Sequence, residues 1–285
     1  RIYELTGRKQ PGVLLRMKEK FDDIVAHPIE ADLTFGAPPP DGWRVTDRWT
    51  WADSLYMAPP TLALLAKITR DERYLRFVDA EYRVAYDALY DNREDLFYRD
   101  ARYVDQRTPN GAKVFWSRGN GWVYAGLALF LDSLPGDYSN RRFYEKLFRE
   151  MTASIVAAQQ PQGYWSPSLH DARHVPNPET SGTALFALGL AWGVRNGLID
   201  TAEHWPVIER AWSANEARIE PRGAVTSVQP PARDPRPFNA GSMVPYGTGA
   251  VLMAGAEIVR ALGDEPQIDT ARLAAKAMEL AADAP

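Results

Sequence analysis

The sequence contains no cysteine and only four histidines in 285 residues. The lack of cysteine excludes disulfide bonds and thiolate metal sites. It leaves the cellular compartment open, because a cysteine-free protein tolerates either redox environment. The histidines, His27, His170, His174 and His204, show no spacing with nearby carboxylates that is typical of a metal site. We therefore expect no bound metal.

The sequence also lacks a basic tract and a long hydrophobic run. Its formal net charge is −4, whereas a nucleic-acid-binding surface needs clustered Lys and Arg, so we expect no such partner. No apolar run approaches about 18–20 residues, so no membrane span is predicted. The chain opens on Arg1-Ile2-Tyr3-Glu4-Leu5-Thr6-Gly7, which resembles the end of a helix. We therefore expect a further segment upstream of Arg1. Because any targeting signal would lie in that segment, both a cytoplasmic and a periplasmic location in a bacterium stay open.

Aromatic residues are plentiful, with nine tryptophans and thirteen tyrosines. Several tryptophans stand beside glycines and polar residues. Such rings can stack on the C–H faces of sugars or simply fill a core, and composition leaves both interpretations open. These tryptophans are Trp49, Trp51, Trp116, Trp122 and Trp165.

Helical periodicity dominates the chain, because apolar residues recur at i, i+3, i+4 and i+7 while strand-like alternation is scarce. An all-α protein is predicted. The expected helices are Pro60–Ile68, Tyr74–Leu89, Val123–Leu134, Phe143–Gln159, Thr183–Gly193, Val207–Ala217 and Thr248–Leu262.

Four segments share one plan, in which a polar and aromatic loop leads through a Gly- or Pro-marked turn into a small-residue helix. Their reference residues, Asp53, Arg118, Ser181 and Thr248, are separated by 65, 63 and 67 residues, so each unit is a helix hairpin. Stacked hairpins form either an open solenoid or a closed α/α toroid. The toroid is favoured, since the Gly-rich helices suit an inner ring and the amphipathic ones an outer ring.

The organisation expected from these repeats is a single (α/α)6 toroid over residues 1–285. A complete six-hairpin toroid at this repeat length needs more residues than the sequence has, so one or more N-terminal hairpins are expected to be missing. In a toroid the loops before the inner helices converge, so distant motifs would share one site.

Asp53 is the first candidate for chemistry, because it is surrounded by Trp51, Leu55 and Met57. Partial desolvation would raise its pKa and let it exchange protons near neutral pH. A helix N-cap is the equal alternative, since Asp is common there and Pro59 and Pro60 favour a helix start.

Further candidates lie in the later motifs. Arg118, next to Trp116 and followed by Gly119 and Gly121, could pair bidentately with a carboxylate or bond loop carbonyls. The pair Arg99 and Asp100 leads into that motif and could instead be a solvated loop pair. Two more candidates for lining a pocket are Trp165 and His170, although a single His is more often structural.

Taken together, the motifs resemble the unsaturated rhamnogalacturonyl hydrolases, glycoside hydrolase family 105, which are related to the unsaturated glucuronyl hydrolases. The resemblance runs from about residue 1 to about residue 262. It implies an α/α toroid of six hairpins and no cofactor. The segments that carry it are Trp51–Pro60, Phe115–Trp122, Glu179–Gly182 and Tyr246–Ala250.

The resemblance also implies an activity and a set of site residues. Family members hydrate the C4=C5 double bond that a polysaccharide lyase leaves on a terminal uronic acid of pectin or a similar polymer. The family's catalytic Asp falls on Asp53, and its sugar-binding Trp-x-Arg falls on Trp116 and Arg118. A second active-site Asp of many members would lie before Arg1, and Arg99 stands where many carry His. The expected substrate-binding residues are Trp51, Met57, Arg99, Asp100, Trp116, Arg118, Trp122, Trp165 and His170.

Two alternatives remain beside the unsaturated uronyl hydrolase. One is another α/α-toroid sugar enzyme, such as a polysaccharide lyase or a sugar epimerase. The other is a non-catalytic helical scaffold that binds carbohydrate. The sequence does not decide the sugar behind the uronate or the oligomeric state.

Overall fold

The computed structural model describes residues 3, 7–8, 11–28 and 48–263. Helices dominate this part of the chain, and one two-stranded antiparallel sheet joins Tyr90–Asp91 (β1) to Leu96–Phe97 (β2). The helices are α2 (Pro11–Ala26), α3 (Ser54–Met57), α4 (Pro59–Thr69), α5 (Arg73–Leu89), the 3-10 turn η2 (Ala101–Tyr103), α6 (Ser117–Ser133), α7 (Arg141–Ala157), α8 (Thr180–Arg195), α9 (Thr201–Glu216) and α10 (Pro245–Ala261).

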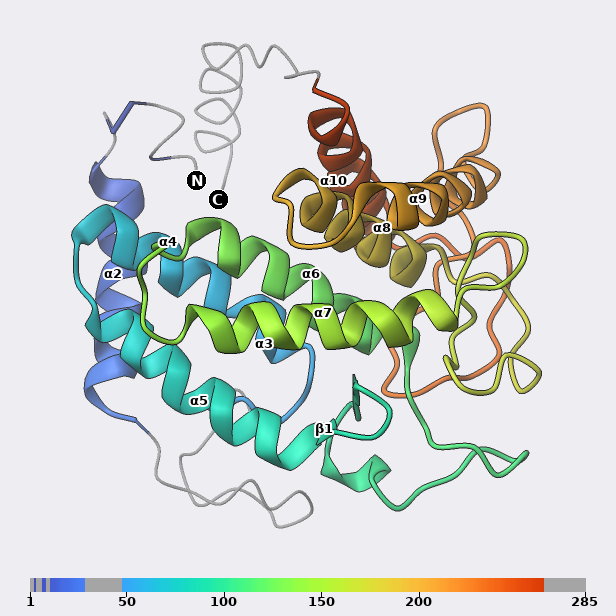
Figure 1. Cartoon of the computed structure of the whole chain (residues 1–285), viewed down its shortest axis with the longest axis horizontal. Coiled ribbons are helices and arrows are strands. Elements are labelled where there is room, and N and C mark those ends of the chain that lie inside the picture. Colours follow the sequence, from blue (N-terminus) through green and yellow to red (C-terminus); the bar gives the residue numbers. More distant parts are fainter. Residues whose placement is uncertain (1–2, 4–6, 9–10, 29–47, 264–285) are drawn as a thin grey trace, which may run out of the picture.

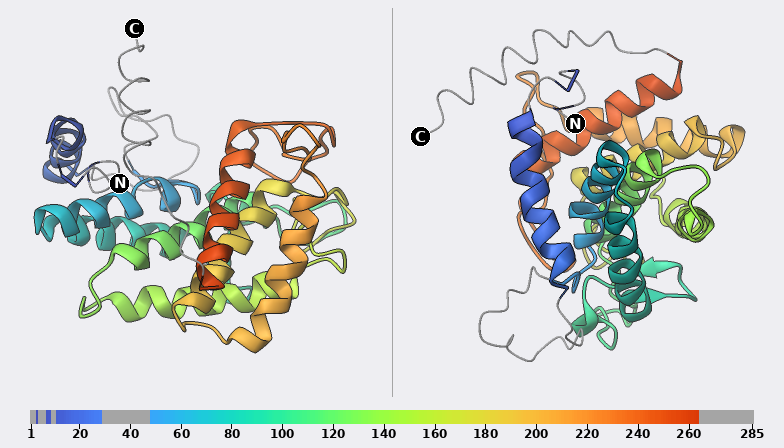
Figure 2. Two further views of the ribbon diagram at one scale, coloured as in Figure 1. Left: turned by 90° about the horizontal axis from the view of Figure 1, so that it is seen from above. Right: turned by 90° about the vertical axis from the view of Figure 1, so that its left-hand side faces the viewer.

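Alternate helices form an inner layer in chain order: α4 packs on α6, α6 on α8, and α8 on α10. Every residue of α8 from Thr180 to Val194 is buried, because its Ala- and Gly-rich sequence lets neighbours approach on all sides. An outer layer follows, with α5 on α4, α7 on α6 and α9 on α8. Figure 1 and Figure 2 show these hairpins side by side along an arc. The predicted inner and outer rings of an all-α toroid are confirmed.

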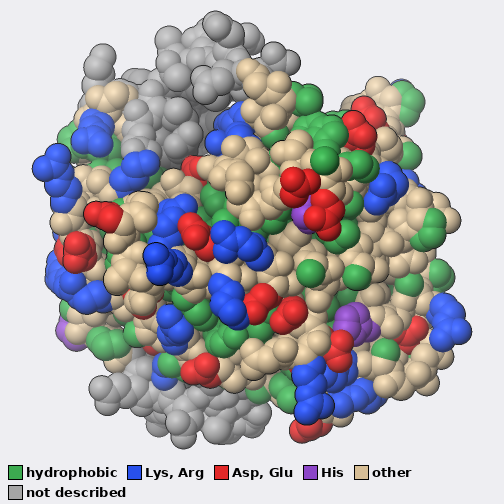
Figure 3. Space-filling model, in the orientation of Figure 1, with side chains coloured by type: hydrophobic (Ala, Val, Ile, Leu, Met, Phe, Trp, Pro, Cys, Tyr) green, Lys and Arg blue, Asp and Glu red, His purple; other side chains and the backbone are tan. Residues whose placement is uncertain are grey.

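The outer helices are amphipathic, as their apolar periodicity requires. On α5, Tyr74, Val78 and Tyr82 are fully buried. On the solvent side of α7, Arg141 pairs with Glu145 and Lys146 with Glu150. Figure 3 shows acidic and basic side chains interspersed on the face that includes α5 and α7. Within the described residues, no helix is both long and apolar enough to cross a membrane.

The inner helices begin earlier than periodicity predicted. Helix α6 starts at Ser117, not Val123, and α8 and α10 start three residues ahead of their predicted starts. The three later motifs therefore occupy the first turns of their inner helices, whereas the Asp53 motif forms α3 just before α4. The glycines of the inner helices let neighbouring helices touch, as expected for a tightly packed inner ring: a Cβ on Gly126 would lie 2.6 Å from the Leu55 carbonyl oxygen. Helix α2 and the β1–β2 hairpin were not predicted.

Candidate active site

The candidate site lies where the amino-terminal ends of successive inner helices meet. Asp53 immediately precedes α3 and holds the N-cap position, yet its side chain makes no capping hydrogen bond. Asp53 is 9% exposed, and its side-chain oxygen Oδ1 has no hydrogen-bond partner. The cap interpretation therefore fails, and a buried carboxyl with a free oxygen remains.

Burial dominates the electrostatics of Asp53. Desolvation raises the pKa of this carboxyl to about 6, and the positive charges of Arg99 and Arg118 offset only part of that rise. The group is thus poised to exchange a proton near neutral pH, as general acid–base catalysis requires.

Arg99 and Asp100 form a buried network beside Asp53 and not a solvated loop pair. Asp100 is fully buried and accepts hydrogen bonds from Arg99 Nη1 at 2.5 Å and Arg102 Nη2 at 2.7 Å. Burial alone would raise the pKa of Asp100. The hydrogen bonds from Arg102 and Arg99 outweigh burial and hold this pKa below its usual value. Arg99 Nε lies 3.7 Å from Asp53 Oδ2 and has no hydrogen-bond partner.

Trp116, the N-cap residue of α6, and Arg118, in the first turn of α6, contact a loop far along the chain. Arg118 donates from Nη1 to the Gln229 carbonyl at 2.5 Å and from Nη2 to the Pro230 carbonyl at 3.0 Å. Its guanidinium carbon lies 4.4 Å from the centre of the Trp116 ring. Arg118 is only 2% exposed. Here it anchors this loop, so the bidentate substrate pair predicted for it would require those bonds to open.

Two polar residues whose roles were not predicted complete this junction. Glu179 caps α8, accepting from the Ser181 and Gly182 amides, and lies 3.8 Å from Arg118. Gln229 Oε1 accepts from Trp116 Nε1 at 2.8 Å, and the Gln229 backbone N–H donates to Glu179 Oε1 at 3.1 Å. Glu179 lies in one of the repeated motifs, but its capping of α8 was not predicted from the sequence, and nothing local marks Gln229.

Aromatic rings line the same end of the inner layer. The ring centre of Tyr56 lies 4.6 Å from that of half-buried Trp122. The ring centre of Trp122 lies 6.4 Å from that of Tyr246 on α10. Arg118 also stands 4.9 Å from the Tyr246 ring. Trp51 is half-buried just before Asp53, and Met57 is 54% exposed at the end of α3.

Two further residues predicted to line the pocket, Trp165 and His170, pack against other side chains. Trp165 is fully buried, and its indole donates to the Ile155 carbonyl while its ring packs on Phe186. The expectation that Trp165 lines a pocket is therefore wrong, because tertiary packing encloses the ring. His170 lies against Phe115, 3.8 Å from Glu94, and burial lowers its pKa.

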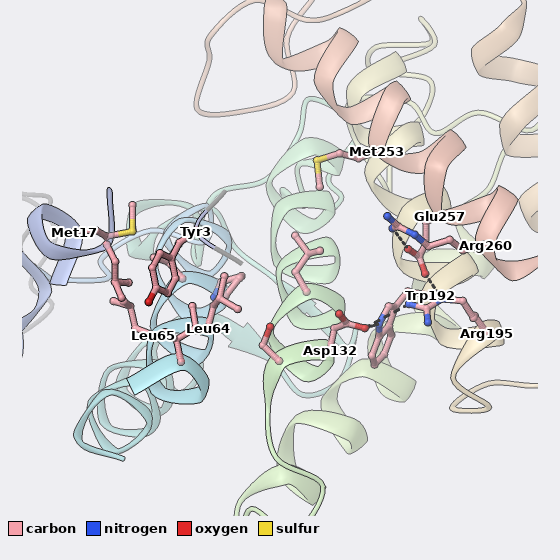
Figure 4. Close-up of a pocket in the computed structure, with 16 residues that line it drawn as sticks. Tyr3, Met17, Leu64, Leu65, Asp132, Trp192, Arg195, Met253, Glu257 and Arg260 are labelled. Atoms are coloured by element: carbon pink, nitrogen blue, oxygen red, sulfur yellow. Dashed lines mark hydrogen bonds and ion pairs between the residues drawn. The ribbon is translucent and has the colours of Figure 1, made fainter. Parts of the chain in front are cut away.

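A hollow of about 750 Å³ lies at the opposite end of the inner helices and does not include Asp53. Figure 4 shows apolar side chains of α4 and α10 facing it, with Asp132, Arg195, Glu257 and Arg260 along one edge. No cluster of three or more potential metal ligands occurs among the described residues.

The sequence comparison decides the family. The family model described as Glycosyl Hydrolase Family 88 matches residues 1–262. The chain belongs to this family. The predicted relationship to the unsaturated uronyl hydrolases is confirmed. The matching family model is described as family 88, whereas the motifs suggested family 105.

Similar proteins agree with that membership. An unsaturated 3S-rhamnoglycuronyl hydrolase of Formosa agariphila is 41% identical over 266 residues, 91% of this chain and 70% of the relative. A family 88 glycosyl hydrolase of Bacteroides vulgatus has a solved structure with 35% identity and a TM-score of 0.76, covering 87% of this chain and 68% of that one. A second structure, described as a polysaccharide lyase, is 38% identical with a TM-score of 0.76. The match covers 90% of this chain and 69% of that one. The family 88 chain is an enzyme of the glycoside hydrolase type.

Proposed function

We propose that this family 88 hydrolase removes a terminal 4,5-unsaturated uronic acid from lyase-generated oligosaccharides, with Asp53 as acid and base. The observation that carries the proposal is the buried Asp53 carboxyl, which has a free Oδ1 and a pKa raised to about 6 by desolvation. The 41% identity to an unsaturated 3S-rhamnoglycuronyl hydrolase supports the substrate class.

In the proposed step, protonated Asp53 gives its proton to C4 of the unsaturated sugar while water adds its oxygen to C5. The same carboxylate takes the proton that the water loses, so the enzyme is regenerated. The C5 hemiketal then opens to a ketone, and the C1 hemiacetal left behind releases the next sugar. No second carboxylate is needed to attack C1, in contrast to ordinary glycosidases.

Arg99 is proposed to hold the uronate carboxylate. Its Nε is unpartnered beside Asp53, whereas both terminal nitrogens of Arg118 already bond carbonyls. Arg99→Ala should raise the KM for an unsaturated disaccharide about 10-fold or more, because a charge-assisted hydrogen bond is lost. An unchanged KM would exclude this role.

The substrate is proposed to be the one in the name of the Formosa relative, an unsaturated 3S-rhamnoglycuronyl oligosaccharide. Lyase digests of ulvan, pectin and glycosaminoglycans should be compared as substrates. Faster turnover of a pectin or glycosaminoglycan digest would reject the 3S-rhamnoglycuronyl assignment and leave the hydration chemistry standing.

A polysaccharide lyase is the second candidate, because one similar structure carries that description. The enol-ether absorbance separates the two activities. Hydration consumes the double bond and lowers the absorbance, while a lyase acting on the intact polymer raises it. Asp53→Asn should abolish the decrease, and a rise in absorbance with the unmodified protein would replace the hydrolase proposal.

A further inference from the structure

Asp100 is a buried carboxylate whose two oxygens are both fixed by arginines. Oδ1 accepts from Arg102 Nε at 2.8 Å and from the Arg102 amide at 3.1 Å. Oδ2 accepts from Arg102 Nη2 at 2.7 Å and from Arg99 Nη1 at 2.5 Å. Asp100 is therefore held by Arg102 and in turn holds Arg99.

The Arg99 guanidinium lies between two carboxylates and bonds only one of them. It donates to Asp100, while its Nε stops 3.7 Å short of Asp53 Oδ2. The backbone keeps these groups near one another, because the Ala52 amide donates to the Arg99 carbonyl at 2.8 Å. The 3.7 Å contact is an ion pair without a hydrogen bond, and a small side-chain movement would turn it into a hydrogen-bonded pair.

We propose that Asp100 is a positioning residue, which with Arg102 holds the Arg99 guanidinium back from Asp53 and leaves Arg99 Nε free for substrate. This inference rests on the proposed function of Asp53 and Arg99. A hydrogen-bonded Arg99–Asp53 pair would stabilise the ionised carboxylate further than the present 3.7 Å contact does and would remove the proton that the hydration step needs.

The charged groups that face Asp53 are Arg99 and Asp100, from the segment after β2, and Arg118, from α6. Burial raises the pKa of Asp53, the two arginines lower it, and the negative charge of Asp100 raises it slightly. Removal of the Asp100 charge and release of Arg99 toward Asp53 act in the same direction, toward a lower pKa of Asp53.

The test is a titration of the Asp53 carboxyl by carbon-13 NMR in the full chain, with Asp53→Asn assigning the signal. Asp100→Asn should lower the Asp53 midpoint by about one unit or more, and Arg99→Ala should raise it. Asp91→Asn is the matched control, because Asp91 on β1 is comparably bonded by Lys113 at 2.6 Å and Tyr98 at 2.8 Å. Its loss should leave the Asp53 midpoint unchanged.

Kinetics provide a second readout. In Asp100→Asn the alkaline limb of kcat/KM should move to lower pH by the same amount, with kcat near neutral pH reduced about 10-fold. Loss of activity with an unmoved Asp53 midpoint would overturn the proposal and make Asp100 an anchor for η2 alone. If Asp100→Asn does not fold, Asp100→Ser keeps a hydroxyl for the Arg102 amide and decides between the same outcomes.

The two proposals can fail separately. The NMR titration needs no substrate, so an opposite or absent shift in the Asp100 variants rejects the positioning role whatever the enzyme acts on. Failure of the unmodified protein to consume any unsaturated oligosaccharide rejects the proposed function and leaves the titration result intact.

Discussion

Asp53 combines an N-cap position with a side chain that does not cap. Asp is favoured at such positions because its oxygens accept amide hydrogen bonds, yet here Oδ1 accepts none. A buried carboxyl with one oxygen left without a hydrogen bond costs stability, which is typical of groups held ready for chemistry.

The first prediction concerns pH. Because the proposed step begins with protonated Asp53, kcat/KM should fall as pH rises through about 6, the value to which burial raises its pKa. A pH–rate profile on an unsaturated disaccharide measures this limb. A profile that is flat from pH 5 to pH 8 would contradict the role of Asp53 as the acid.

The second prediction concerns the stability of the same residue. The folded-state pKa of Asp53 is raised from 3.8 to about 6, so the folded protein binds more protons than the unfolded chain between these values. Stability therefore decreases as pH rises through that window and stays reduced above it. Asp53→Asn should increase the free energy of unfolding at pH 8 by up to about 3 kcal/mol, and less at pH 4. Urea denaturation at both pH values checks the difference.

At the scale of the elements, the glycines of the inner helices determine how closely the helices approach. A Cβ at Gly126 on α6 would lie 2.6 Å from the Leu55 carbonyl oxygen and 2.9 Å from Tyr56 Cα. Both atoms belong to α3, the short helix that follows Asp53, so they cannot move without moving the site.

The third prediction follows from that contact. Gly126→Ala should destabilise the protein by about 1–3 kcal/mol through overpacking and lower kcat by displacing Asp53. Gly249→Ala on α10 is the matched control, since nothing lies within 4 Å of its added Cβ. It should raise stability by about 0.5–1 kcal/mol through helix propensity. Thermal unfolding of the two variants should move in opposite directions.

At the scale of the whole molecule, ion pairs tie the far ends of the inner helices together. Glu257 on α10 is 5% exposed in its side chain and bonds Arg195 of α8 at 2.6 Å and Arg260 at 3.0 Å. Arg195 also approaches Asp132 of α6 at 3.4 Å. These residues border the hollow shown in Figure 4.

The fourth prediction is that this network is structural. Glu257→Gln removes a buried carboxylate from two partly exposed arginines and should cost about 1.5–3 kcal/mol of unfolding free energy, the range for hydrogen bonds to charged groups. Glu150→Gln, which breaks the largely exposed Lys146–Glu150 pair on α7, should cost under about 1 kcal/mol. Chemical denaturation of both variants makes the comparison. Equal losses would show that burial does not set the energy of these pairs.

Part of this protein is determined by its sequence alone. Apolar periodicity marked the helices, and the 63–67-residue spacing of Asp53, Arg118, Ser181 and Thr248 indicated hairpins whose ends converge. These signals are local or repetitive, so a single chain displays them. Tertiary structure decided the rest: the pKa of Asp53, the enclosure of Trp165 and the junction at Gln229. Each arises from contacts between residues far apart in the chain, and neither periodicity nor spacing records which distant groups surround a buried side chain.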